Sequence, residues 1–371
     1  RSELVLYRGL ASLRLEDASM TDTYDDDGNV RFPGEDDFET VLEKDPGNPM
    51  AWAALLHGRM AVYYRLNDEG KTKQAERNFV FANETMDRAI NVAGESFEVS
   101  AVVLRELLLQ RTTLLQKLVA NPNAVPQEEL DAINEKIVEA RDVLATAYDP
   151  VLHFARAGEI ASLLNSTNAD GKEVAASVLQ STVEEHPDDF GRKYMLAGLL
   201  LELDRVDEAI TISEEVLGAE NQTVGLHAIE LFSIRPLFAQ LLVRIYVDKS
   251  KEAEDETKQV AFIDVAKAYR TELYDLMSSK EDHQFVLYVD GIIALAEKKY
   301  AQAAQKLQET IQRNPNVEAR VYRQAAFALS QSNARGLALE FLRVAIEKEP
   351  SNLGNYLAKA QLEIELSEID D

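Results

Sequence analysis

Cysteine is absent from this chain of 371 residues, and tryptophan occurs once. Without cysteine the chain has no disulfide framework, no thiolate zinc site and no thiol nucleophile. Basic residues are scarce as well, with 39 Lys and Arg against 65 Asp and Glu and a formal charge of −26. We therefore expect no binding to nucleic acid or to anionic membranes, because both require cations that neutralise phosphate.

Long apolar runs are also missing, since charged residues interrupt every stretch that approaches the roughly 20 residues of a membrane span. Hydrophobic residues nevertheless make up 46% of the chain, which predicts a soluble globular protein without membrane insertion. The chain begins at Arg1-Ser2 without a methionine or an apolar leader, which indicates a trimmed or processed chain. Its compartment is left open between the cytoplasm and an extracytoplasmic space such as the periplasm.

Motifs of catalysis are not found. The five histidines lack the spacing of a helical metal motif, and the glycines do not form a phosphate-binding loop or a nucleophile elbow. Adjacent carboxylates carry little information in a chain with 65 of them. We assign no catalytic residue and no cofactor, and we predict that the chain is not an enzyme.

What the sequence does contain is the helical period. Apolar residues recur at intervals of three and four, and the ten prolines fall near the ends of these segments. The segments 97–119 and 126–148, joined at Asn121-Pro122-Asn123, predict an antiparallel helical hairpin. In the stretch 222–280 we expect a second long hairpin, with Pro236 ending one helix and starting the next.

Four turns share one pattern, in which a charged or polar last helical turn precedes a proline and then a turn or N-cap residue. These turns lie at Pro46, Pro187, Pro315 and Pro350. The last two prolines are 35 residues apart, and at the same offset Gly291 matches Ala326 and Leu307 matches Leu342. Such recurrence is typical of a repeat protein.

On these residues the chain resembles the tetratricopeptide repeat (TPR) superfamily, whose unit is a helix-turn-helix of about 34 residues. The resemblance is best at 284–368, fair at 156–221 and limited to helical pairs elsewhere. It implies an all-α fold, a right-handed α-solenoid of antiparallel helix pairs with about 16 to 18 helices. We expect an irregular N-terminal region at 1–148 and a TPR-like region at 149–371.

An acidic loop is expected at 17–37 within the N-terminal region. Asp22, Asp25, Asp26 and Asp27 precede Gly28, and clustered carboxylates with a turn glycine are what calcium binds. Placing Gly28 at the glycine position of an EF-hand puts Thr23 first and Gly34 at the bidentate position, which argues against that motif. A solvated loop without metal is the favoured interpretation.

The resemblance also implies a concave surface that binds a peptide. Carrying over the family's inward-facing positions gives Tyr194, Phe285, Tyr288, Ile292, Arg320, Arg323 and Phe327. Two arginines and several aromatic rings on so acidic a chain predict an anchor for an acidic or aromatic segment, although the same side chains can simply pack against a neighbouring helix.

Three functions are compatible with this reading. The first is a scaffold or adaptor that binds a protein or peptide partner. The second is a structural or self-assembling subunit of a larger complex, in which the hairpin at 97–147 mediates self-assembly, as in a homo-oligomer, or docking into that complex. The third is the repeat region of a longer enzyme or of a secretion or transport component.

Overall fold

The computed structural model describes residues 2–14, 23–219, 226–277, 283–350 and 352–370. Apart from one two-stranded hairpin and one short 3-10 helix, the described elements are α-helices, in agreement with the predicted all-α fold. There are 17 α-helices in this part of the chain, within the expected number. The chain divides into two compact units, residues 1–185 and residues 186–371. The boundary predicted at residue 148 concerns the regularity of the repeats and not these compact units, and it stays a prediction.

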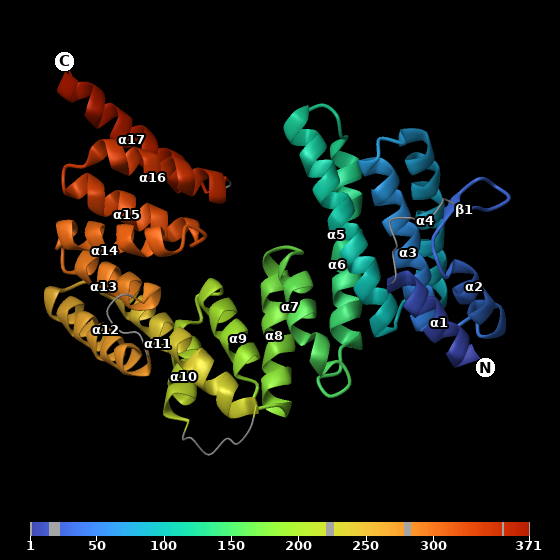
Figure 1. Cartoon of the computed structure of the whole chain (residues 1–371), viewed down its shortest axis with the longest axis horizontal. Helices are drawn as coiled ribbons and strands as arrows, with labels where there is room; N and C mark the ends of the chain where they lie inside the picture. The colour runs from blue at the N-terminus through green and yellow to red at the C-terminus, as the bar shows by residue number, and fades with distance from the viewer. Residues whose placement is uncertain (1, 15–22, 220–225, 278–282, 351, 371) are drawn as a thin grey trace. The chain divides into compact units, whose positions relative to one another are not determined.

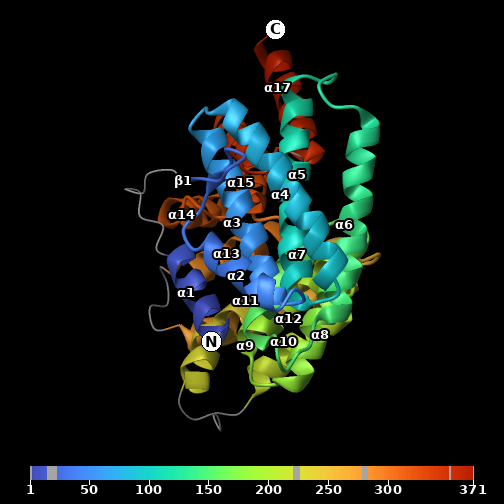
Figure 2. The same ribbon diagram turned by 90° about the vertical axis from the view of Figure 1, so that its right-hand side faces the viewer.

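In its described residues, the N-terminal unit contains four pairs of consecutive helices that pack against each other, coloured from blue to green in Figure 2. Its elements are α1 (Ser2–Arg14), β1 (Thr23–Tyr24), β2 (Val30–Arg31), α2 (Glu35–Lys44), α3 (Pro49–Asp68), α4 (Thr72–Ala93), α5 (Phe97–Ala120), α6 (Gln127–Ala147), the 3-10 helix Phe154–Arg156, α7 (Ala157–Asn165) and α8 (Ala169–Glu185). The pair α5–α6 is the predicted hairpin. Asn48 and Ser96 begin α3 and α5 as N-caps, because each side-chain oxygen accepts a hydrogen bond from a first-turn amide.

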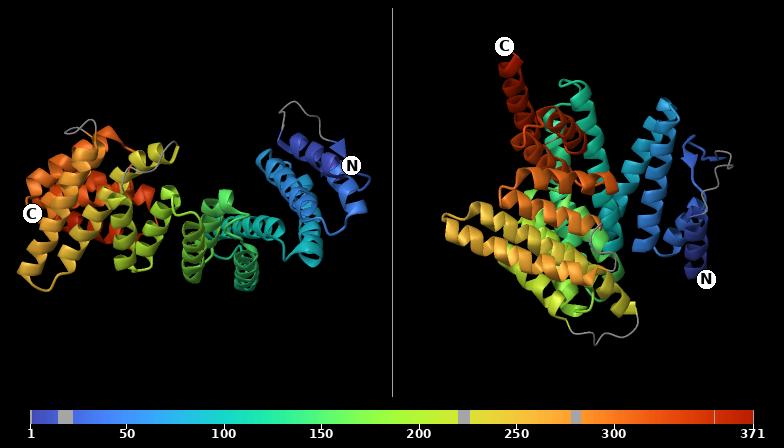
Figure 3. Two further views of the ribbon diagram at one scale, coloured as in Figure 1. Left: turned by 90° about the horizontal axis from the view of Figure 1, so that it is seen from below. Right: turned by 60° about the vertical axis from the view of Figure 1, so that its left-hand side comes forward.

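The C-terminal unit contains four more pairs and a last helix, and α13 to α17 stack in chain order (Figures 1 and 3). Its helices are α9 (Phe190–Glu202), α10 (Val206–Gly218), α11 (Leu226–Glu252), α12 (Glu256–Leu276), α13 (Gln284–Ala296), α14 (Tyr300–Arg313), α15 (Ala319–Gln331), α16 (Arg335–Lys348) and α17 (Leu353–Asp370). The first helices of neighbouring pairs contact one another, as α9 does α11, α11 does α13 and α13 does α15. These helices together form one wall of the unit.

Four pairs share the turn between their two helices, which the sequence pattern had not revealed. A residue with positive φ ends the turn in each case, with φ of 72° at Gly70, 60° at Asp204, 60° at Lys298 and 65° at Asn333. The next amide then donates to the carbonyl five residues earlier, as Lys299 does to Ala294 at 2.8 Å. This is the Schellman arrangement, which satisfies carbonyls left free at a helix end. The pair α3–α4 of the N-terminal unit has the same cap, with Lys71 donating to the Leu66 carbonyl at 2.9 Å.

Close approach of two helices explains the glycine of the first regular repeat. A Cβ atom at Gly291 would lie 2.7 Å from Cγ of Leu307, so α13 and α14 can pack this closely only without a side chain. Both Leu307 and Ala303 are fully buried. The core of the last repeats continues from there through Ala326 and Leu342, the partners expected from the 35-residue offset.

Two local predictions were wrong. Pro236 lies inside the continuous helix α11 and does not mark the predicted boundary between two helices. The helix continues because Phe238, Leu242 and Val243 are fully buried beyond it, and because Phe232, whose carbonyl loses its amide partner, is largely exposed and open to water. The acidic loop is also shorter than expected, since its residues 35–37 form the first turn of α2.

All three of these acidic residues form ion pairs, and two of them, Glu35 and Asp37, are withdrawn from solvent. The Glu35 carboxylate is 2% exposed and bonds to Arg59 at 2.8 Å, while Asp37 pairs with Arg8. Burial raises the pKa of Glu35, and the charges of Arg59 and Arg31 act against that rise. This network attaches the start of α2 to α3, which a loop in water could not do.

Candidate functional site

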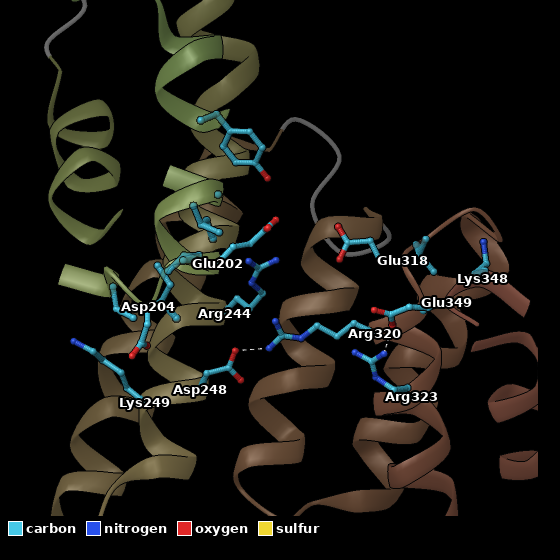
Figure 4. Close-up of a pocket in the computed structure, with 18 of the residues that line it drawn as sticks. Glu202, Asp204, Arg244, Asp248, Lys249, Glu318, Arg320, Arg323, Lys348 and Glu349 are labelled. Carbon is cyan, nitrogen blue, oxygen red and sulfur yellow. Dashed lines mark hydrogen bonds and ion pairs between the residues drawn. The ribbon is translucent and has the colours of Figure 1, made fainter. Parts of the chain in front are cut away.

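A cavity in the C-terminal unit has a volume of about 950 Å³ and lies among α9, α11, α15 and the end of α16 (Figure 4). A second cavity of about 270 Å³ adjoins it on the side of α13 and α14. They share the lining residues Tyr194, Leu241, Arg244, Asn316, Val317 and Glu318. We call the two together the groove, with a main pocket and a side pocket.

Local sequence explains how the groove is held open. The turn at Pro315 separates α14 from α15, and Tyr322 donates from its hydroxyl to the Pro315 carbonyl at 2.8 Å. In the N-terminal unit, Trp52 makes the corresponding bond to the Pro46 carbonyl at 2.7 Å. An aromatic donor on the following helix thus fixes the direction of the proline turn, and at 315 this turn brings residues 316–318 to the groove.

Charge of both signs lines the main pocket, with five cationic and six acidic side chains. Most cations have partners. Arg320 pairs with Asp248 and Arg323 pairs with Glu349, as the dashed lines in Figure 4 mark. Lys249 reaches Asp207 at 2.9 Å. Burial would raise the pKa of Asp248, but the positive charge of Arg320, together with that of Lys251, outweighs it and holds the pKa below its ordinary value.

Arg244 differs from these cations. It stands on α11 between the two pockets, and within the described part of the chain its guanidinium has neither a hydrogen bond nor an ion pair. Tyr194 and Tyr288 lie close enough for its charge to act on both phenols, where it opposes the rise in pKa that burial causes. Neither phenol hydroxyl has a hydrogen-bond partner among the described residues. Three unused donors therefore lie together in the groove.

The seven residues expected on the concave surface are only partly brought together. Tyr194, Arg320 and Arg323 line the main pocket, and Phe285 and Tyr288 line the side pocket with Tyr194. Phe327 lies outside both pockets, half exposed beside the Tyr300 ring at 6.1 Å.

Two of the expectations need correction. Ile292 has no exposed surface, so it cannot contact a partner here. Arg320 and Arg323 are not free cations, since each is neutralised by a carboxylate of the chain. The repeat pattern did not identify Arg244, the arginine without a partner among the described residues, because the sequence of the stretch 222–280 departs from that pattern. A lone arginine in the apolar run Leu241-Leu242-Val243-Arg244-Ile245 was the available signal.

The acidic hairpin provides no comparable site. Asp22 lies outside the described residues, and the carboxylate of Asp25 closes the β-turn by accepting from the Asp27 and Asn29 amides at 3.1 and 2.7 Å. Asp26 and Asp27 are exposed. No group of three residues suited to a metal ion occurs in the described ranges, and none of the helices there has the length and apolarity that crossing a membrane requires.

Comparison with known proteins finds similar solved structures at low sequence identity. No family model and no curated protein matches the chain. A tetratricopeptide repeat protein from Parabacteroides merdae is similar at 10% identity over 98% of each chain, with a TM-score of 0.47. A thermophilic TPR protein of Thermus thermophilus, TTC0263, is 14% identical over 58% of this chain and 100% of its own, with a TM-score of 0.44. The TPR domain of P58(IPK) is 14% identical over 99% of this chain and 98% of its own, with a TM-score of 0.28.

Proposed function

We propose that this TPR-like chain is a non-catalytic scaffold or adaptor that binds an extended segment of a protein partner in the groove of its C-terminal unit. The observation that carries the proposal is the groove itself. It runs past the first helices of successive pairs, and its main pocket alone has room for several side chains at about 950 Å³. Stacked repeats commonly bind partners on such surfaces.

Rigidity of the groove supports binding rather than catalysis. Its walls are helices whose inner faces are buried, and Arg320–Asp248 and Arg323–Glu349 tie together elements far apart in the chain. A preformed surface loses little conformational freedom when an extended peptide enters, which favours affinity. No serine, cysteine or histidine occurs among the described residues that line the groove.

Gly198 offers a sharp test, because it lines the main pocket and a Cβ atom added there would meet nothing within 4 Å. Gly198→Trp should fill the pocket without straining α9, since a glycine inside a helix is not needed for the fold. Gly336→Trp is the matched control, because Gly336 also has open space at its Cβ but does not line the groove.

Affinity capture from source-cell lysate, read by mass spectrometry, compares the unchanged chain with these two variants. The proposal expects a partner that is retained by the unchanged chain and by Gly336→Trp but lost with Gly198→Trp. Equal capture by all three would place the binding surface elsewhere and refute the proposal.

Self-assembly is the second candidate, favoured by one observation. Leu109, Leu115 and Val119 of α5 are exposed, the last at 87%, on the hairpin expected to pair between chains. Light scattering over a wide range of protein concentration tests it. A mass that stays that of the monomer would remove this candidate, and a dimer abolished by Leu115→Asp would support it.

A further inference from the structure

We propose that Arg244, with the hydroxyls of Tyr194 and Tyr288, forms an anion site that binds the side-chain carboxylate of an Asp or Glu within the partner segment. The inference rests on the proposed function and specifies which side chain of the partner segment the groove binds. Its basis is the combination of the unpartnered Arg244 guanidinium and Tyr194 phenol on the wall shared by two cavities with the unpartnered Tyr288 phenol in the side pocket, all within the described residues.

The other two arginines of the groove are already engaged. Arg320 and Arg323 each have a carboxylate of the chain as partner, so their charges are compensated before any ligand arrives. Arg244 is partly withdrawn from solvent among Leu241, Ile245 and the two tyrosines. A charge in that environment loses hydration and gains more from an opposite charge than one in open water does.

The planar guanidinium matches a carboxylate, which can accept two parallel N–H bonds, and the phenols can donate to the same oxygens. A phosphate dianion fits less well, because Glu202, Asp248 and Glu318 also line the groove and would repel a second negative charge. The same acidic residues favour lysine or arginine at neighbouring positions of the segment. We therefore expect one acidic residue flanked by basic or apolar ones.

The position of Arg244 also decides between an internal carboxylate and a chain end. Because Arg244 lines both the main pocket and the side pocket, space continues from it in two directions. A segment can pass through and lay an internal side chain on Arg244, whereas a terminal carboxylate would leave one pocket empty.

The test uses random linear peptides displayed on phage and selected on the immobilised full-length protein. Selected sequences are then synthesised with amidated C-termini, so that their only carboxylates are side chains. Dissociation constants are measured by fluorescence anisotropy. The inference expects an internal Asp or Glu in the binders. Changing that residue to Asn or Gln should weaken the affinity about 10- to 100-fold.

Arg244→Gln should produce a similar loss, and combining it with the amide peptide should add little, because the two changes remove one interaction. Tyr194→Phe and Tyr288→Phe keep the rings and should weaken binding less. Arg343→Gln, on the exposed face of α16, is the control and should leave the affinity unchanged. Since Arg244 has no partner in the described chain to lose, the melting temperature of Arg244→Gln should stay that of the unchanged protein.

Failure takes distinguishable forms. Peptides that bind Arg244→Gln as tightly as the unchanged protein, but fail to bind Gly198→Trp, would overturn this inference and leave the proposed function standing. Binding that requires a free C-terminal carboxylate would overturn the internal anchor. Peptides that bind Gly198→Trp without loss, or a selection that yields no saturable binder, would overturn the proposed function and this inference with it.

Discussion

Adding one methyl group at Gly291 should destabilise the C-terminal unit, although alanine is the better helix former. Alanine inside a helix is favoured over glycine by about 1 kcal/mol. The new Cβ atom would lie 2.7 Å from Cγ and 2.9 Å from Cδ2 of Leu307, a buried side chain with little room to move. Overpacking of this kind costs about 1 to 3 kcal/mol, so we expect a net loss of about 1 kcal/mol in the free energy of unfolding.

A second substitution separates the steric effect from the intrinsic one. Leu307→Ala alone should cost about 2 to 5 kcal/mol, as truncation of a buried leucine does. In that background the clash is gone, so Gly291→Ala should now stabilise by about 1 kcal/mol. The coupling between the two sites is then about 2 kcal/mol.

Denaturant unfolding followed by far-ultraviolet circular dichroism measures all four proteins of this cycle. The reasoning requires the sign of the Gly291→Ala effect to change with the residue at 307. If Gly291→Ala is equally destabilising with leucine and with alanine at that position, the close approach of α13 and α14 does not explain the glycine.

Other substitutions test the shared turn, the paired aspartate and the buried ion network. Gly70 (φ 72°) and Lys298 (φ 60°) occupy the same turn position, so Gly70→Ala should destabilise by about 1 kcal/mol and Lys298→Gly should stabilise, both read by thermal unfolding. Because the pKa of Asp248 is lowered in the folded state, its ionised form stabilises the fold above the ordinary pKa of 3.8. Asp248→Asn should therefore lower the free energy of unfolding at neutral pH. Unfolding curves should show this loss fading as the pH falls below 3.8. Arg59→Met removes the hydrogen-bonded partner of the buried Glu35 carboxylate and leaves it only Arg31, at 3.8 Å, as a cation. The substitution should cost about 3 kcal/mol, followed through the fluorescence of Trp52, and a smaller loss at neutral pH than at acid pH would contradict the network.

Much of the fold could be predicted from the sequence, because helix pairs leave local marks. Proline turns, N-caps such as Asn48 and the helical period located the hairpins, and small residues at Gly291 and Ala326 located the repeats. Local rules failed where distant contacts decide. Pro236 did not end α11, since buried neighbours hold the helix beyond it. Glu35 was predicted in the acidic loop but is buried, because it pairs with Arg59. That partner lies 24 residues away in the sequence, beyond the reach of local rules.

The candidate site was predicted less well for the same reason. Family positions identified Tyr194 and Tyr288, but they could not reveal that Ile292 is fully buried or that Asp248 neutralises Arg320. The second fact depends on how the long helix α11, which carries Asp248, approaches α15. The sequence of α11 does not follow the pattern of the regular repeats, so the way this helix packs could not be predicted from them.

The location of the binding surface is the central claim, and the absence of cysteine permits a direct measurement. Glu318→Cys places a unique thiol on the wall shared by both pockets, and Glu340→Cys places one on α16 away from them. Each variant is labelled with a benzophenone maleimide and irradiated with the partner recovered by capture. The account predicts a crosslink from position 318 and none from position 340. Crosslinking from 340 alone, or equally from both, would contradict it.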